Sequence, residues 1–359
     1  MTSSTLGRLH PALHHSSPRS AIRWEAPFGR RPFHAAAART MSTSQGSAPQ
    51  GATAPAGQAD WSASQYLKFH AQRTRPVHDL VAQLPSPPIP ASGARVVDLG
   101  CGPGNSTAVL RARFPDARIS GLDSSPDMVA RARAQPSMRD GPAAVDFHQA
   151  DLLSWSPDQL PVGGGGGGGG DRHQPVHLFF SNAVLHWLRR HDRVPTIVRL
   201  VRTQAPGGVF AFQCPDNWAE PSHAAMREVA LRPGRPWSAA FAAHPPSRPG
   251  EGESGDPERP DMDAIESPED MYNALIPHCA SVDVWKTTYQ HVLPGPREIV
   301  EWVKGTGLMP FLNRIPEQGG AREAFLSAYK ERLAELYPPL ADGQVTLRYP
   351  RLFVIAVRK

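Results

Sequence analysis

The sequence predicts an α/β fold: a doubly wound, mostly parallel sheet of seven strands with helices on both faces. The first observation is a short run of apolar and β-branched residues, 95–99, that breaks into a glycine-rich turn and then opens a helix. The second is the alternation of apolar strands with helical segments over 118–213, which is typical of a parallel sheet. The third is a pair of further strand patterns, 282–292 and 351–357, near the end of the chain.

Two short helices are expected before the glycine-rich turn. Ser62 or Ser64 can cap the first. The second begins at Pro76, has apolar side chains on one face, and ends near residue 84, before a proline-rich run. The other expected strands are 118–122, 145–148, 176–181 and 208–213, and the other expected helices are 105–114, 126–134, 192–203, 296–305 and 320–336.

Charge and composition exclude several classes of function. The whole chain carries a net charge of +5, and the segment before Asp60, with six arginines and one acid, also carries +5. The rest is therefore balanced and gives no argument for a nucleic-acid partner. No apolar run approaches the ~18 residues of a membrane span, so no membrane partner is expected. Three cysteines without paired spacing argue against a disulfide framework or a metal site.

The first 59 residues form a basic leader. They are rich in Arg, Ser, Ala and His and nearly free of acids, a composition that matches a mitochondrial transit peptide or a disordered extension without a signal. A start at Met41 would give a shorter, cytoplasmic form. Residues 60–359 are expected to form the folded domain. Within it, the glycine run 163–170 and the Pro/Arg/Glu-rich segment 232–268 are expected to be disordered.

The glycine-rich turn predicts a nucleotide site at the end of the first strand. Its spacing is Asp98-x-Gly100-x-Gly102-x-Gly104, and Asn105 stands where a dinucleotide site would favour another glycine. An acid at the end of the second strand should then bind ribose hydroxyls, and Asp123 has the expected spacing of ~20 residues. Asp151, at the end of the third strand, suits the amino group of an adenine.

This glycine-rich element resembles motif I of the class I S-adenosylmethionine-dependent methyltransferases, and the whole of 60–359 resembles the trans-aconitate methyltransferases. The resemblance implies a Rossmann-like fold with a helical cap over the active site. It divides the domain into a cofactor-binding core (92–213), a cap with the insertion (214–281) and C-terminal sheet and helices (282–359). The shared motifs include Asn182-Ala183-x-Leu185-His186-Trp187, and the most particular ones are Pro215-Asp216-Asn217-Trp218 and Tyr349-Pro350-Arg351-Leu352-Phe353.

The same resemblance implies the reaction and its residues. The reaction is methyl transfer from the cofactor S-adenosylmethionine to a carboxylate of trans-aconitate or a related small polycarboxylic acid, giving a monomethyl ester. The expected cofactor-binding residues are Asp98, Gly100, Gly102, Gly104, Asn105, Asp123, Ser124, Asp151 and Asn182. The expected substrate-binding residues are Arg73, Arg75, Trp218, Arg227 and Arg351.

Elementary chemistry assigns roles to these side chains. A carboxylic acid has a pKa near ~4, so its anion is present at neutral pH without a catalytic base. Full-charge contacts to the reacting oxygens would favour the ground state over a transition state in which charge is cancelling. We therefore expect neutral donors, Gln72 and Trp187, to align the reacting carboxylate. Arginines, which grip carboxylates bidentately, should hold the other two.

Two other functions stay open on the sequence. One is methylation of a carbon or a phenolic oxygen, which would need a base such as His186. The other is cofactor binding without turnover, if the 232–268 insertion blocks the pocket. The sequence does not decide the exact acid or the oligomeric state.

Overall fold

The computed structural model describes residues 69–85, 93–138, 145–160, 175–248, 250, 253 and 255–359. All of them belong to one unit, which runs from Ala56 to Lys359. The basic leader, the expected helix caps Ser62 and Ser64, and the glycine run 163–170 lie outside the described residues. Within this described part, no helix has the length and apolar character to cross a bilayer.

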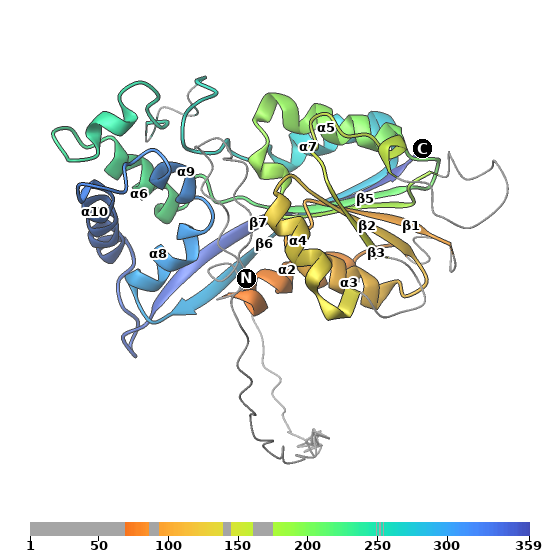
Figure 1. Ribbon diagram of the computed structural model, residues 1–359, viewed down its shortest axis with the longest axis horizontal. Helices are drawn as coiled ribbons and strands as arrows, with labels where there is room; N and C mark the ends of the chain where they lie inside the picture. Colours follow the sequence, from red (N-terminus) through yellow and green to blue (C-terminus); the bar gives the residue numbers. More distant parts are fainter. Residues whose placement is uncertain are drawn as a thin grey trace, which may run out of the picture. The chain divides into compact units, whose positions relative to one another are not determined.

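The described residues contain one mixed sheet, as expected. Its strands are β1 (Arg95–Leu99), β2 (Arg118–Asp123), β3 (Val145–Gln149), β4 (Leu178–Asn182), β5 (Val209–Pro215), β6 (Cys279–Leu293) and β7 (Val345–Arg358). Their order is β3-β2-β1-β4-β5-β7-β6 (Figure 1). The first five strands are parallel, and β7 runs antiparallel to both β5 and β6. The carboxyl ends of β1, β2 and β4 therefore meet at one edge.

Helices cover both faces of this sheet and form a separate group beside it. They are α2 (His70–Ala82), α3 (Asn105–Arg113), α4 (Pro126–Ala134), α5 (Arg190–Arg202), α6 (Pro221–Ala230), α7 (Pro268–Leu275), α8 (Pro296–Lys304), α9 (Met309–Leu312) and α10 (Ala321–Leu336), with a short 3-10 helix η4 (Leu185–Trp187). Figure 1 shows α2, α3 and α4 on one side of the sheet, and α5 and α7 on the other.

Alternate residues of the central strands belong to two different apolar cores, one on each face of the sheet. Val96 and Phe180 pack with α2 and α3, whereas Val97 and Phe179 pack on the face that α5 and α7 cover. Because successive side chains of a strand point to opposite faces, an apolar run of this kind must be buried on both sides. These local rules explain why the core strands could be predicted.

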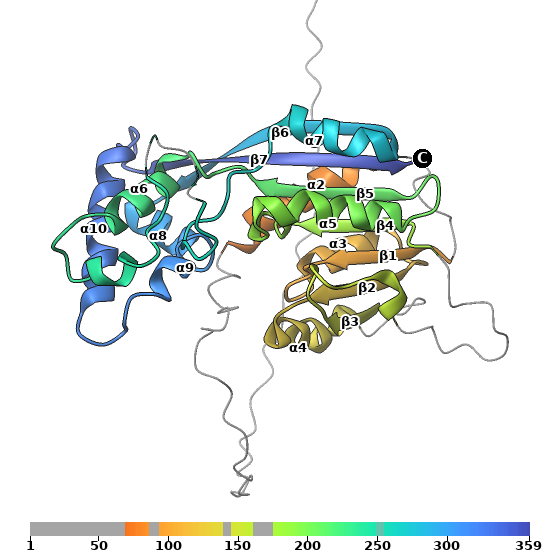
Figure 2. The same ribbon diagram turned by 90° about the horizontal axis from the view of Figure 1, so that it is seen from above.

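The cap is built on an extension of the last two strands. β5 pairs with β7 over Arg351–Val357, but β6 pairs with it from Val345 onward, so the ladder continues past β5. On this extension α6, α8, α9 and α10 form a separate apolar core, distinct from the two on the faces of the sheet (Figure 2). The cap therefore draws more of its helices from 296–336 than from the expected segment 214–281. Arg351 lies where the sheet passes into the cap.

Two element boundaries differ from the prediction. α2 is one helix that contains Pro76, where the sequence predicted a new start. Proline removes one backbone hydrogen bond of the helix. The next turn stays helical because Val77, Leu80 and Val81 are buried in the core and hold the helix in place. β7 begins at Val345 rather than residue 351. Pro350 is tolerated because it lies just before the part of β7 that pairs with β5, and its carbonyl accepts from Asp216 N–H at 2.9 Å.

The 232–268 segment, expected to be disordered, has a defined path over its described residues. The reason is a network of buried charges that composition could not reveal. Arg193, fully buried on α5, pairs with Glu266 at 2.8 Å and donates to the carbonyl of Ala264. Arg189 and Arg259 both bind Asp263. Arg193 also donates to the carbonyls of Leu185 and Leu188, which ties the insertion to η4.

Candidate active site

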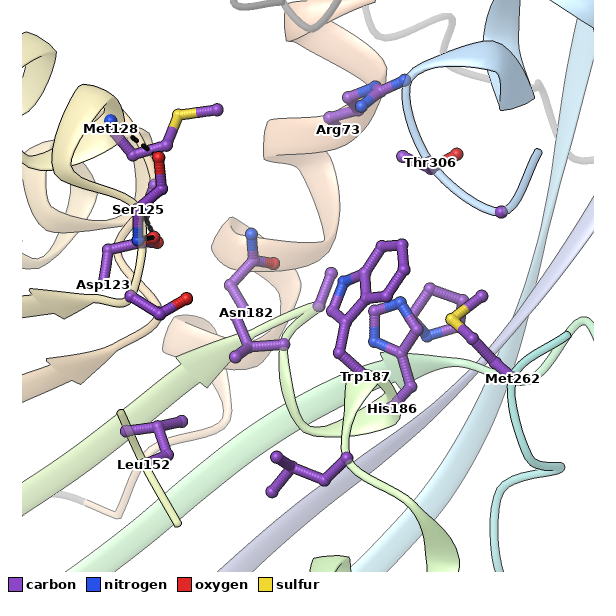
Figure 3. Close-up of a pocket in the computed structure, with 18 of the residues that line it drawn as sticks. Arg73, Asp123, Ser125, Met128, Leu152, Asn182, His186, Trp187, Met262 and Thr306 are labelled. Carbon is purple, nitrogen blue, oxygen red and sulfur yellow. Dashed lines mark hydrogen bonds between the residues drawn. The ribbon is translucent and has the colours of Figure 1, made fainter. Parts of the chain in front are cut away.

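A cavity of about 350 Å³ opens at the carboxyl ends of β1, β2 and β4 and is closed on its far side by the cap. This is the position where open α/β sheets bind ligands, and the volume lies in the range of small-molecule sites. Figure 3 shows Asp123, Ser125 and Met128 on one side of the cavity and Trp187 and Thr306 on the other. Asn182 lies between them.

The glycine-rich turn forms the floor on the Asp123 side. Gly100 and Gly102 both have positive φ, +70° and +55°, which favours glycine. A Cβ atom at Gly100 would lie 2.2 Å from Val184 Cγ2, whereas at Gly102 it would meet nothing within 4 Å. A side chain at position 100 would therefore clash with Val184, the residue just before η4. At position 102 the lack of a side chain leaves the backbone accessible to a ligand.

Asp123 is fixed at the edge of the cavity by two backbone groups. Its Oδ2 accepts from Gly102 N–H at 2.9 Å, and its Oδ1 accepts from Ser125 N–H at 2.9 Å. Burial raises the pKa of this carboxyl, and the two N–H bonds oppose that rise. Since a carboxylate has about four acceptor sites, roughly two remain to receive hydroxyl groups of a ligand.

Three residues expected to bind the cofactor lie behind the turn instead of on the cavity wall. Asp98 is fully buried and accepts from Ser106 Oγ at 2.7 Å and Thr107 Oγ1 at 2.6 Å, so it fastens the first turn of α3 to β1. Burial raises the pKa of Asp98 to about 6. Gly104 is the N-cap of α3 and Asn105 its first residue. Gly100, Gly102, Asp123, Ser124, Asp151 and Asn182 do border the cavity.

A buried amide joins the two halves of the site, and sequence reasoning missed it. Gln213, fully buried at the end of β5, donates from Nε2 to Asn182 Oδ1 at 2.5 Å. Its Oε1 accepts from Arg351 Nη1 at 2.8 Å. Asn182, Gln213 and Arg351 thus form a hydrogen-bonded row across β4, β5 and β7. The signal available in the sequence was a single polar residue at the end of an otherwise apolar strand.

Two buried arginines lie on the cap side of the cavity. Arg73 donates from Nη2 to the carbonyl of Trp302 at 3.0 Å, and its guanidinium lies 5.7 Å from the centre of that indole. Arg351 lies 5.2 Å from the ring of Tyr349. Both border the cavity together with Trp187. Trp302, Thr306 and Tyr349 also border the cavity, and the sequence assigned them no role in the site.

Gln72, expected to align the reacting carboxylate, and Arg75, expected to bind the substrate, point away from this cavity. Gln72 is exposed, and the side chain of Arg75 is 71% exposed, 4.0 Å from Asp79. Neither borders the cavity. Successive helix residues turn by about 100°, so the burial of Arg73 on α2 directs its neighbour at 72 and the residue at 75 toward solvent. Trp218 and Arg227 lie deeper in the cap, beside a smaller cavity.

His186 is buried next to Trp187 and borders the cavity. Burial, with the nearby charges of Arg193 and Arg351, lowers the pKa of its imidazole well below the usual value. The ring is therefore neutral at physiological pH and is a weak base.

Comparisons with known proteins identify the family. Residues 96–208 match a family model described as a methyltransferase domain. The trans-aconitate 2-methyltransferase of Methylobacterium nodulans is 46% identical over 300 residues, which cover 84% of this chain and 99% of the relative. The chain belongs to the trans-aconitate 2-methyltransferase family. Members from Rhodopseudomonas palustris and Rhizobium rhizogenes are each 42% identical, over 84% and 83% of this chain and 100% and 99% of their own lengths.

Among solved structures, the YcgJ protein of Bacillus subtilis aligns with a TM-score of 0.44 at 13% identity, over 79% of this chain and 98% of its own. That similarity is too low to support an inference. The family membership confirms the expected resemblance and rests on the sequence relatives.

The expected mitochondrial signal is wrong. The relatives that match this chain over most of its length are bacterial proteins, and bacteria have no mitochondria. The prediction rested on the Arg-rich, acid-poor composition of residues 1–59, and composition of that kind is shared by many basic segments that carry no such signal.

Proposed function

We propose that this chain transfers a methyl group from S-adenosylmethionine to a carboxylate of trans-aconitate. The observation that carries the proposal is the chemical asymmetry of the cavity, within a family whose named members act on this acid. Asp123 and Asp151 stand at one end, and Arg73 and Arg351 stand at the other. The acidic end suits hydroxyl and amino groups of a nucleoside, and the basic end suits a polycarboxylate.

The residues of the acidic end fit S-adenosylmethionine. When bound, it supplies an electrophilic methyl group. Asp123 has the acceptor capacity for ribose hydroxyls, Asp151 borders the cavity at the end of β3, and Gly102 leaves space beside its backbone. Asn182, held by Gln213, presents a fixed amide. These residues bind and orient the cofactor toward the cap side of the cavity.

The residues of the basic end bind the acid. Arg73 and Arg351 are buried cations that can each form charge-assisted hydrogen bonds to carboxylates that do not react. Trp187, between Asn182 and His186 in Figure 3, is the neutral donor suited to the reacting carboxylate. Its indole N–H supplies orientation without a full charge, so it does not stabilise the ground-state anion over the transition state. Gln72 is not retained in this role.

No residue has to remove a proton, because the acid is already ionised at neutral pH. The lowered pKa of His186 makes it a poor base for a carbon acid or a phenol. The chain's contribution is to align the carboxylate with the methyl group and exclude water. Positioning of this kind can supply on the order of 7–11 kcal/mol.

A transfer assay with a panel of acids tests the proposal. The purified chain is incubated with S-adenosylmethionine carrying a labelled methyl group and with trans-aconitate, cis-aconitate, citrate, a monocarboxylate and a phenol, each in turn. We expect the highest kcat/KM for trans-aconitate. Faster labelling of the phenol, or of the monocarboxylate, would contradict the proposed substrate class.

A further inference from the structure

A second, smaller cavity of about 20 Å³ adjoins the first, deeper in the cap. We call it the Arg227 cavity; its walls include His186, Asn217, Trp218, His223, Arg227 and Asp261. His186, Asn217 and His223 also border the larger cavity, so the two spaces share a wall. A cavity needs about 10–15 Å³ to hold one water molecule, so there is room for one small polar group.

Arg227 is a buried cation without an anionic partner in the described part of the chain. It is 3% exposed, its Nη1 donates to the carbonyl of Trp218 at 2.9 Å, and its guanidinium stacks 4.1 Å from the centre of the Trp218 ring. Its Nε has no hydrogen-bond partner. Burial lowers the pKa of Arg227, but a guanidinium stays protonated at neutral pH. A buried charge of this kind is unfavourable unless an anion approaches it.

Asp261, the acid that acts on the pKa of Arg227, is held by other groups. Asp261 Oδ1 accepts from Ser247 N–H at 3.0 Å, and its Oδ2 lies 3.7 Å from Arg259 Nε. Asp261 raises the pKa of Arg227 only through space, and no ion pair within 4.0 Å joins them among the described residues. The positive charge of Arg227 is therefore available to a ligand.

Four further polar atoms on residues that line the cavity also lack hydrogen-bond partners among the described residues. Three belong to aromatic rings, Trp218 Nε1, His223 Nε2 and His186 Nδ1, and the fourth is Asp261 Oδ2, the carboxylate oxygen that faces Arg259; all four are shielded from solvent. The Nδ1 atom of His223 lies 3.1 Å from Ser222 Oγ, so Nε2 carries the proton when the hydroxyl donates to Nδ1. Burial lowers the pKa of His223 to about 3, which keeps its ring neutral. One cation, two neutral donors and one carboxylate, which faces Arg259, thus line a space that opens on the wall of the larger cavity.

We propose that the Arg227 cavity is a subsite for one non-reacting carboxylate of the acid, and that it selects tricarboxylates over dicarboxylates. The proposal rests on the proposed function and deepens it. Trans-aconitate carries three carboxylates. One faces the methyl group near Trp187, one is bound by Arg73 and Arg351, and the third extends past His223 to Arg227. An acid that lacks this third group leaves Arg227 unpaired and gains nothing from it.

The test compares trans-aconitate with three dicarboxylates in the wild-type chain and in Arg227→Gln. Mesaconate lacks the carboxymethyl carboxylate, glutaconate lacks the carboxylate on the substituted double-bond carbon, and itaconate lacks the carboxylate on the unsubstituted one. In R227Q, kcat/KM for trans-aconitate should fall about 10- to 100-fold, the effect of losing hydrogen bonds to a charged group. The dicarboxylate that lacks the carboxylate bound in the subsite should change less than twofold.

Two further variants complete the design. Arg232→Gln removes an arginine just beyond α6 that pairs with Glu228 and borders neither cavity, so kcat/KM for all four acids should stay within twofold of the wild type. Arg227→Lys keeps the charge and should lose less than R227Q toward trans-aconitate. Calorimetric binding of S-adenosylmethionine at wild-type affinity shows that each variant is folded.

Equal losses for all four acids in R227Q would show a structural role and overturn the subsite. An unchanged kcat/KM for trans-aconitate would show that the cavity holds only water, and would overturn it as well while leaving the proposed function intact. A wild-type chain that methylates none of these acids would overturn both proposals.

Discussion

Replacement of Arg351 by glutamine tests how the substrate is anchored. Arg351 is 5% exposed, borders the cavity and donates to Gln213 at 2.8 Å. A glutamine removes the positive charge and the bidentate fork, and it keeps one amide that can still donate within the cap. The loss is one set of charge-assisted hydrogen bonds to a carboxylate, about 1.5–3 kcal/mol, or roughly a 10- to 150-fold weaker interaction.

This loss should appear in KM. A non-reacting carboxylate is held equally in the ground state and in the transition state, so its anchor contributes uniform binding. Initial rates over a range of trans-aconitate concentrations should give a KM raised at least tenfold, with kcat within about threefold of the wild-type value.

Arg75→Gln is the matched control for R351Q. It makes the same substitution and the same change of charge on a side chain that is 71% exposed and borders neither the large cavity nor the Arg227 cavity. Its KM and kcat should stay within twofold of the wild type. If Arg351→Gln lowers kcat at unchanged KM, or if both variants behave alike, then Arg351 is not the anchor.

Three further predictions follow from the geometry. Asp123→Ala should weaken S-adenosylmethionine binding about 10- to 100-fold by calorimetry; an unchanged affinity would exclude Asp123 from the cofactor site. Trp187→Phe keeps an aromatic ring but removes the N–H, so kcat should fall about tenfold, which corresponds to the loss of one hydrogen bond. Gln72→Ala should change kcat less than twofold. The reverse result would restore the role expected for Gln72. The buried Asp98 has a pKa raised to about 6, above its unfolded value of 3.8, so it favours folding most below pH 4 and this contribution is lost as the pH rises through 6. Denaturant unfolding should therefore show Asp98→Asn gaining up to ~3 kcal/mol on the wild type between pH 4 and pH 7; the same difference at both pH values would refute it.

The parts of the fold that the sequence predicted correctly depend on local rules. The run 95–99 is apolar and β-branched, and the turn after it needs glycine where Gly100 meets Val184. The helix 126–134 was placed correctly because a serine precedes a proline at its first position, and Ser125 accepts from Met128 N–H at 3.3 Å. Signals of this kind are complete within a few residues.

What the sequence did not reveal depends on contacts between distant segments. The described residues of the 232–268 insertion have a defined path because Arg193 and Arg259 pair with carboxylates that composition counts only as charges. The identity of Gln213 as the link between Asn182 and Arg351 needs the strand order, which places β7 beside β5.

Which residues of an expected helix face the site also needs the structure. Gln72 and Arg73 are neighbours in a motif, and only the packing of α2 decides that Arg73 turns inward and Gln72 outward. The same holds for the arginines: Arg351 reaches the large cavity, Arg227 a smaller one and Arg75 the solvent. Their residue type indicated a carboxylate ligand, and their positions assign the separate roles.

The position of the transferred methyl group tests the central claim most directly. The chain is incubated with trans-aconitate and S-adenosylmethionine carrying a carbon-13 methyl group, and the product is examined by nuclear magnetic resonance before and after mild alkali. We predict one labelled O-methyl ester resonance that alkali removes as methanol. A labelled methyl group on carbon, stable to alkali, or cofactor binding with no labelled product, would contradict the account.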